Sequence, residues 1–314
     1  MTTLRMATLS ISRAWHARAD QLAVAMTPSR RRALRDGLIV AGLIFNLTLL
    51  LFWAPRLYLW IDAEAWHRID LTDLYRGMGH PDFPGLFRYS PVIAWLFVPA
   101  SWLSWPALIA VYLAMSGLAL VALTRAQAWL FVVAFPPVLL ELLNGNIHLF
   151  MALAVWVGLR WPAAWAFILL TKVTPGVGLL WFAGRRDWRG LVIALGTTAA
   201  IVVVGVLIAP GQWVDWVRSL VFGSAEPAAP GVPPLWLRLP VAAAIAFAAG
   251  RTGRAWLVPV SVFLGLPQLW IQGLAILTAS FPLYWERDRW RVDGRLVAPE
   301  GATRRNQPAE VPAA

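Results

Sequence analysis

Long apolar stretches alternate with short polar breaks along most of the chain. The first stretch runs from Gly37 to Trp60, and others follow at about residues 91–104, 106–124, 128–143, 147–159, 161–183, 190–209, 235–250, 255–265 and 267–285. A helix of about 20 apolar residues crosses a bilayer, and several of these stretches are shorter than that. The pattern predicts an all-α, polytopic integral membrane protein with about 10 transmembrane helices.

Proline interrupts several of the predicted spans, at Pro136-Pro137, Pro175, Pro259 and Pro267. A proline removes a helical hydrogen bond, and a bilayer tolerates the freed backbone groups only beside protein or a polar cavity. We therefore expect kinked or half-penetrating helices around a polar cavity at membrane depth.

The composition agrees with a membrane environment and narrows the possible chemistry. Hydrophobic residues make up 59% of the 314 residues and charged residues 14%, whereas soluble domains carry about 25% charge. The chain has no cysteine, which excludes a disulfide framework, a thiolate metal site and a cysteine nucleophile.

The net charge of +11 comes almost entirely from arginine, and the arginines gather in a few polar segments. Residues 1–36 are rich in arginine, as are the 184–190 turn and the tail at 286–314. Positive residues favour the cytoplasmic side and anionic lipid, and an even number of crossings places all three segments there. We expect both termini in the cytoplasm, the inner (plasma) membrane as location, and no nucleic-acid partner.

This orientation divides the chain into three parts. Residues 1–36 form a basic cytoplasmic segment, residues 37–285 a transmembrane domain, and residues 286–314 a polar tail predicted to be disordered. Two external loops are expected, at 60–90 and at 210–234, and the prolines of the second favour an irregular rim.

Asp62 occupies a distinctive position among the acidic residues of the first external loop. It follows the aromatic end of the first span, so a rigid helix would hold its carboxylate near the membrane surface. Partial desolvation raises the pKa of such a carboxyl and makes it a better proton acceptor. The Asp62-Ala63-Glu64 spacing also allows a metal site, but two carboxylates without a fixed third ligand are a weak signal. We predict no metal.

The same loop ends in Arg88-Tyr89-Ser90-Pro91, directly before the second span. Proline fits the first turn of a helix, which places Arg88 and Tyr89 at the level of the lipid headgroups. Tyr89 is either an interfacial anchor or a ligand contact. Arg88 either extends to the membrane surface or binds a phosphate.

A polar segment, Asn144-Gly145-Asn146-Ile147-His148, separates two apolar stretches, and Glu141 lies one helical turn before it. Such polar groups are costly beside lipid, and their number suggests hydrogen bonding to a polar ligand. A plain turn with a glycine C-cap is the alternative.

Lys172 is the only lysine of the chain and lies within the predicted 161–183 span. An ammonium at that depth must be paired or must face a cavity. A phosphate or pyrophosphate group is a natural partner for it, and an internal ion pair with Glu141 is the alternative.

Five features follow one another along the chain, namely the Asp after the first span, Asp73-Leu74-Tyr75, Tyr89-Ser90-Pro91, the Asn-Gly-Asn break and Lys172-Val173-Thr174-Pro175. In this order and spacing they resemble glycosyltransferase family 87, the polyprenyl-phosphate-mannose-dependent mannosyltransferases of the GT-C superfamily. The resemblance covers about residues 37–190, and the C-terminal third is similar only in hydropathy. The break departs from the family pattern, because Asn146 replaces an expected Gln and His148 an expected Asn.

The resemblance implies a GT-C-like fold and an inverting hexosyltransferase. The donor would be a polyprenyl-phosphate sugar, with mannose as the hexose, and the acceptor a glycolipid or polysaccharide on the extracytoplasmic face. Asp62 would be the catalytic base, and Tyr89 and Pro91 would shape the pocket. The candidate substrate-binding residues are Glu64, Arg88, Tyr89, Asn144, Asn146, His148 and Lys172.

The leaving group explains why so few catalytic groups are needed. A departing polyprenyl phosphate is already a stable anion, so one carboxylate suffices to deprotonate the acceptor hydroxyl. Arg88, Lys172 or Arg218 would neutralise the phosphate in place of a divalent metal, and no cofactor is expected.

Two other classes of protein remain open. A transporter or flippase of lipid-linked sugars also needs polar breaks and a buried lysine, but it should show inverted repeats and intramembrane acids. Glu141 and Asp187 are the only acids that suit that role. A catalytically silent binding subunit predicts instead that Asp62 is dispensable.

Overall fold

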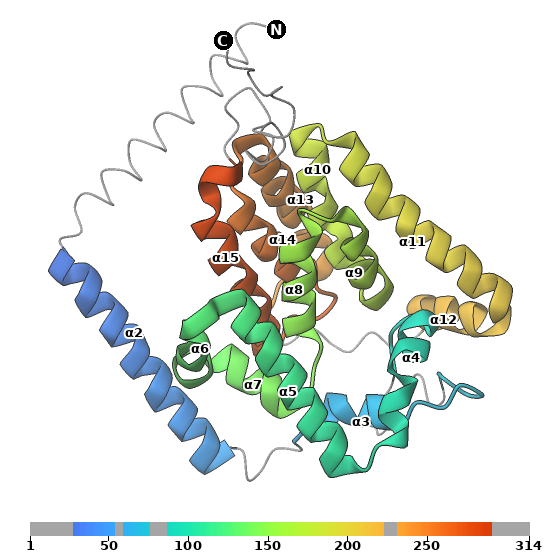
Figure 1. Cartoon of the computed structure of the whole chain (residues 1–314), viewed down its shortest axis with the longest axis horizontal. Helices are drawn as coiled ribbons and strands as arrows, with labels where there is room; N and C mark the ends of the chain where they lie inside the picture. Colours follow the sequence, from blue (N-terminus) through green and yellow to red (C-terminus); the bar gives the residue numbers. More distant parts are fainter. Residues whose placement is uncertain (1–27, 54–58, 76–86, 223–230, 291–314) are drawn as a thin grey trace, which may run out of the picture. The chain divides into compact units, whose positions relative to one another are not determined.

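The computed structural model describes residues 28–53, 59–75, 87–222 and 231–290. Every regular element within these ranges is helical (Figure 1), which confirms the all-α class. Most of the predicted basic segment and of the predicted tail lies outside the described residues, as do residues 76–86 and 223–230 of the predicted external loops.

Three helical stretches are long and apolar enough to cross a membrane, namely Arg32–Phe52, Trp105–Ala134 and Trp188–Ile208. A fourth is added if Pro136–Asn144 and His148–Gly158, which are bent by 116°, form one broken span. Most of the other predicted apolar stretches divide into shorter helices at prolines and 3-10 turns, whereas the 235–250 stretch forms one helix, Leu235–Thr252. The described residues support a membrane protein, and they do not confirm a count of about 10 spans.

The chain divides into two compact units, and the first contains residues up to Leu57 together with Trp129–Pro136. Its described elements are α2 (Pro28–Thr48), a π-helical turn (Leu49–Trp53) and most of α6 (Ala128–Ala134). The Asn46 side-chain amide donates to the carbonyl oxygens of Val132 and Val133, at 3.1 and 2.8 Å. Because the last carbonyls of a helix have no partner within it, Asn46 satisfies the end of α6.

The second unit holds the other described elements around a core that includes Trp165, Trp181 and Phe182. Its α-helices are α3 (Ile61–His67), α4 (Pro91–Phe97), α5 (Trp105–Thr124), α7 (Pro136–Asn144), α8 (His148–Gly158), α9 (Trp165–Thr171), α10 (Leu180–Arg185), α11 (Trp188–Ile208), α12 (Pro210–Phe222), α13 (Leu235–Thr252), α14 (Val258–Leu264) and α15 (Ser280–Trp285). Short 3-10 segments join many of them, at 98–102, 125–127, 162–164, 174–179, 255–257, 271–279 and 287–290.

Helices α10 and α13 pack closely because each presents a glycine to the other. A Cβ atom on Gly184 would lie 2.3 Å from the carbonyl oxygen of Phe247, and one on Gly250 equally close to that of Trp181. Small residues allow such backbone contact between membrane helices. Any larger residue at either position would push the two helices apart.

A buried cation caps the end of α14. Arg238 donates hydrogen bonds to the carbonyl oxygens of Pro233, Leu264, Leu266 and Pro267, at 2.7–3.1 Å. Helix C-termini leave carbonyls unpaired, and a guanidinium has enough donors to satisfy several of them. Arg238 thus holds the start of α13 against the segment that follows α14.

The expectation of an irregular rim over residues 210–234 is wrong for residues 210–222, which form α12. Pro210 stands at the first position of this helix, where its missing N–H costs nothing, and the remaining prolines follow the helix. Gln212 accepts a hydrogen bond from Trp95 of α4 and donates one to the carbonyl oxygen of Leu71. Helices α3, α4 and α12 therefore share one end of the second unit (Figure 1).

Candidate functional site

The polar segment between α7 and α8 forms a sharp break that starts with a glycine. Gly145 has a φ of +75° and its N–H donates to the carbonyl oxygen of Glu141, which closes the last turn of α7. The left-handed conformation favours glycine. A Cβ atom at this position would also lie 2.5 Å from the Cβ of Ala63 in α3, so the break and α3 approach closely only because Gly145 has no side chain.

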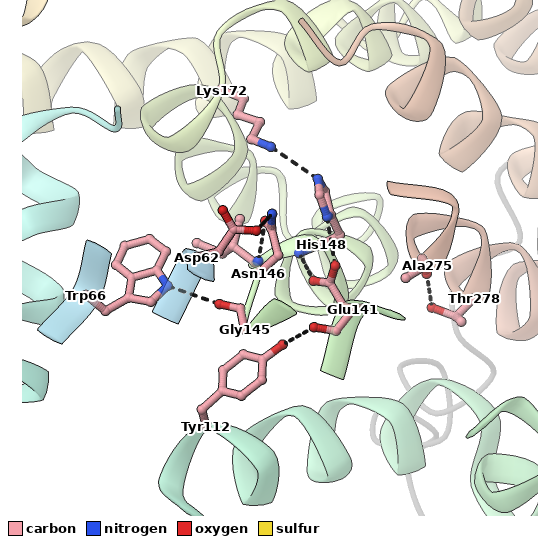
Figure 2. A network of polar contacts seen from close by, with 11 residues as sticks. Asp62, Trp66, Tyr112, Glu141, Gly145, Asn146, His148, Lys172, Ala275 and Thr278 are labelled. Carbon is pink, nitrogen blue, oxygen red and sulfur yellow. Dashed lines mark hydrogen bonds and ion pairs between the residues drawn. The ribbon is translucent and has the colours of Figure 1, made fainter. Parts of the chain in front are cut away.

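Helix α3 is held against this break by two tryptophans. The backbone N–H of Trp60 donates to Leu143 at 2.6 Å, and its indole N–H donates to Leu142 at 3.1 Å. The indole of Trp66 donates to the carbonyl oxygen of Gly145 at 3.3 Å (Figure 2). Trp60 adopts a left-handed φ of 56°, a conformation that costs about 1 kcal/mol or more outside glycine. Its two hydrogen bonds to α7 hold it there.

This docking places Asp62 beside Asn146. The side-chain N–H of Asn146 donates to Asp62 Oδ2 at 2.5 Å, while Asn146 Oδ1 accepts from the N–H of Ile147 at 2.7 Å. Both ends of the Asn146 amide are therefore engaged, and its orientation is fixed. Within the part of the chain that the structure describes, Asp62 Oδ1 accepts no hydrogen bond.

The pKa of the Asp62 carboxyl is raised above its ordinary value, chiefly because burial disfavours the charged form. The positive charge of Lys172 opposes this increase, the negative charge of Glu141 adds to it, and the Asn146 hydrogen bond opposes it. Burial with a nearby cation describes a carboxylate suited to accept a proton.

Glu141, His148 and Lys172 form a second polar chain next to this pair (Figure 2). Glu141 accepts from the backbone N–H of His148 at 2.5 Å, and its other oxygen lies 2.9 Å from His148 Nδ1. His148 Nε2 lies 3.1 Å from the Lys172 ammonium. Lys172 does not pair with Glu141 directly, as one alternative predicted, because the imidazole stands between them.

Lys172 reaches the cluster because α9 ends immediately before it. The residue has an extended backbone, with φ −143° and ψ 115°, and its side chain points back toward His148 (Figure 2). The N–H of Ser90 donates to Leu170 at 3.1 Å, so the end of the first predicted loop lies beside the end of α9.

Tyr89 lies against α3 in an aromatic cluster. Its ring stacks on Trp66 with a centroid separation of 4.8 Å, and Phe87 contacts both rings edge-on. The Tyr75 hydroxyl donates to the carbonyl oxygen of Tyr89 at 2.8 Å. Tyr89 thus supports the helix that carries Asp62.

The other candidate residues have different surroundings. Glu64 is ion-paired with Arg68, and residues two apart on a helix do not face the same way, which argues against an Asp62–Glu64 metal pair. Arg88 is exposed, Asn144 is half-buried at the last position of α7, and Arg218 on α12 contacts Asp215. Among the described residues there is no group of three metal-binding side chains.

Sequence reasoning missed the part played by Trp60 and Trp66. A signal for Trp66 was present, because it lies four residues after Asp62 and therefore on the same face of α3. Trp60 gave none, since its left-handed conformation depends on carbonyl groups of α7 that lie far along the chain.

These features define an integral membrane protein in which acidic, amide, imidazole and ammonium groups gather at a break between two apolar helices. The model of glycosyltransferase family 87 matches residues 87–298. The chain therefore belongs to glycosyltransferase family 87 and is a membrane glycosyltransferase, as the sequence motifs predicted. No curated protein and no solved structure matches it.

The matched range corrects one expectation. It extends to residue 298, so the similarity of the C-terminal third is more than hydropathy. The match includes Tyr89, the 144–148 break and Lys172, and it begins after Asp62. Asp62 is joined to the matched range by its hydrogen bond with Asn146.

Proposed function

We propose that this protein transfers a hexose, mannose by family resemblance, from a polyprenyl-phosphate sugar to a glycolipid or polysaccharide acceptor, with inversion. Asp62 is the general base. The observation that carries the proposal is the carboxylate itself, held by Asn146 through one oxygen and coupled to the charge of Lys172.

The proposed step requires one proton transfer and one displacement. Asp62 Oδ1 takes the proton of the acceptor hydroxyl while the acceptor oxygen bonds to the anomeric carbon. The bond from that carbon to the phosphate oxygen breaks, and its electron pair leaves with the polyprenyl phosphate. No general acid is required, because the leaving phosphate is a weak base.

Lys172 supplies positive charge to the leaving phosphate in this scheme. An ammonium has three N–H donors, and the contact with His148 uses one of them. Two remain for phosphate oxygens, and charge-assisted hydrogen bonds of this kind stabilise a developing anion. Both the phosphate and the base then lie at the α7–α8 break.

The proposal places this chemistry at the extracytoplasmic face of the inner membrane, with both termini in the cytoplasm. The polyprenyl tail would remain in the bilayer while its phosphate enters the site. This arrangement explains why the enzyme carries polar groups at the end of apolar helices.

The first test replaces the base. Asp62→Asn keeps the size of the side chain and removes its ability to accept the proton, so transfer of label from a radiolabelled polyprenyl-phosphate mannose should fall about 100- to 10,000-fold. Asp70→Asn is the matched control, because Asp70 is exposed in the same loop and accepts hydrogen bonds from the backbone N–H and the hydroxyl of Thr72. It should retain activity.

Full transfer by Asp62→Asn would exclude Asp62 as the base. If the wild-type protein moved the lipid-linked sugar across vesicles without transferring it, the flippase hypothesis would replace this one.

A further inference from the structure

We propose that His148 and Glu141 are positioning residues that hold the Lys172 ammonium in place for the donor phosphate, with His148 in the neutral Nδ1–H form. This inference depends on the proposed function for the identity of the phosphate, while its geometric part stands alone. The carrying observation is the unbroken chain from Glu141 Oε2 through His148 to Lys172 Nζ, with contacts of 2.9 and 3.1 Å.

The Glu141 carboxylate and the Lys172 ammonium determine which ring nitrogen of His148 carries the proton. A carboxylate only accepts hydrogen bonds and an ammonium only donates them. His148 Nδ1 faces the carboxylate and therefore carries the proton, while Nε2 faces the ammonium and accepts from it. The hydrogen bond at one ring nitrogen fixes the state of the other. A doubly protonated ring would point an N–H at the Lys172 ammonium.

Glu141 is anchored independently of the ring. Its Oε1 accepts the backbone N–H of His148, one of the unpaired donors at the start of α8, where the helix dipole favours a negative charge. The carboxylate is thus held in position by the helix that carries His148, and the ring orientation follows from it.

The exposure of the three side chains shows which of them can contact a substrate directly. The exposed fraction of Glu141 is 0% and that of His148 is 2%, whereas Lys172 is partly exposed. Neither Glu141 nor His148 has surface to offer a substrate, so both act through the ammonium.

These contacts matter because the ammonium of a lysine is otherwise poorly held in position. Its ammonium ends a flexible four-carbon stem that loses much rotational freedom on binding an anion. A side chain that is already ordered avoids that cost, which is the general benefit of preorganisation. In this protein the only lysine is ordered by the neutral imidazole of His148, which adds no charge that would compete for the phosphate.

The test is Glu141→Gln in the full-length protein, reconstituted in nanodiscs. The glutamine is nearly isosteric, and its oxygen can still accept the His148 N–H, but its amide would donate to Nδ1. The imidazole proton should then move to Nε2 and displace the ammonium. Tyr112→Phe is the control, because Tyr112 donates only to the Glu141 backbone oxygen, at 2.9 Å, and that oxygen also accepts from Gly145.

The first measurement is ¹⁵N NMR of histidine-labelled protein, with the His148 signals assigned by their loss in His148→Gln. We expect a protonated Nδ1 and a bare Nε2 in the wild type and in Tyr112→Phe. The bare Nε2 signal should shift when polyprenyl phosphate is added. A wild-type Nε2–H form, or an unmoved signal with the lipid bound, would overturn the inference without any variant.

The second measurement is affinity. Glu141→Gln should weaken binding of polyprenyl phosphate about 10-fold and raise the donor KM by a similar factor, with the acceptor KM unchanged. A purely structural role would lower the amount of active protein and leave both constants unchanged, and that result would also overturn the inference.

These readouts separate the two proposals. A wild-type protein that binds polyprenyl phosphate and shows the Nδ1–H form but transfers no sugar would retain the positioning chain and refute the transferase scheme.

Discussion

The two carboxylate oxygens of Asp62 have different surroundings. Asn146 donates to Oδ2, so the carboxylate is oriented before any substrate arrives. The sequence predicts that Asp62 lies near the membrane surface, because it follows an apolar helix. It does not predict the partner of Asp62, which lies 84 residues further along the chain.

The environment of Asp62 also predicts a pH dependence. Burial raises its pKa above the ordinary 3.8, and a general base must be ionised. Transfer should therefore fall as the pH drops through the raised pKa, so the acid limb of kcat/KM should lie above pH 3.8. Lys172 opposes the increase, and Lys172→Gln should move that limb to higher pH.

The measurement is kcat/KM against pH in proteoliposomes with a radiolabelled donor. The prediction fails if the limb lies at the ordinary carboxyl value, or if it does not move in Lys172→Gln.

Other residues show where sequence reasoning stops. Polarity within an apolar region was enough to identify Asn146, His148 and Lys172 as unusual. Polarity alone did not show that Asn146 engages Asp62 or that His148 separates Lys172 from Glu141, because those relations depend on the contacts between helices. The binding roles of Glu64, Arg88 and Asn144 stay predictions.

At the scale of elements, the contact between α3 and the α7–α8 break depends on Gly145. The sequence left open a glycine C-cap or a polar ligand cluster, and the structure contains both a glycine turn and a polar cluster. The sequence could not indicate that α3 packs against this turn, because the contact depends on the missing side chain of Gly145, which lies far from α3 along the chain.

Gly145→Ala should therefore damage the site and the fold together. The new Cβ meets Ala63 at 2.5 Å and forces a left-handed φ of 75° on a residue with a side chain. We expect a loss of about 1–3 kcal/mol of stability and a fall in transfer of at least about tenfold. Thermal unfolding followed by tryptophan fluorescence, together with the transfer assay, measures both effects.

Gly196→Ala is the matched control, because a Cβ there meets nothing within 4 Å. It lies inside α11, where alanine is the better helix former, so stability should be unchanged or slightly higher. Equal behaviour of the two variants would show that Gly145 is not required for the docking of α3.

At the scale of the whole molecule, the distribution of arginines predicts which end of α11 faces the cytoplasm, and the fold shows which end lies near the candidate site. Helix α11 is a candidate span of 21 residues, with Arg189 near its start and Gly211 just beyond its end. Gln212, which directly follows Gly211, forms hydrogen bonds with the Trp95 indole and with the carbonyl oxygen of Leu71. The C-terminus of α11 and helix α3 therefore lie at the same end of the second unit.

The absence of cysteine makes this orientation simple to measure. A membrane-impermeant maleimide should label Gly211→Cys in intact cells and Arg189→Cys only after permeabilisation, because arginine-rich turns stay in the cytoplasm. The wild-type protein supplies an unlabelled background. The reverse pattern would place Asp62 on the cytoplasmic side and would contradict an extracytoplasmic reaction.

The number of spans is the property that hydropathy predicted least well. Apolar stretches indicate membrane affinity, but prolines and 3-10 turns divide many of them, and length alone does not decide which pieces cross and which re-enter. Class, family and the unusual residues were all accessible from sequence.

The pairing of Glu141 with His148 has a consequence for biogenesis. A carboxylate entering lipid is costly unless it is hydrogen-bonded, and both partners of Glu141 belong to a residue only seven positions later. The nascent hairpin of α7 and α8 therefore already contains the hydrogen bonds that Glu141 needs when it leaves the insertion machinery. Lys172, synthesised later, joins a pair that is already closed.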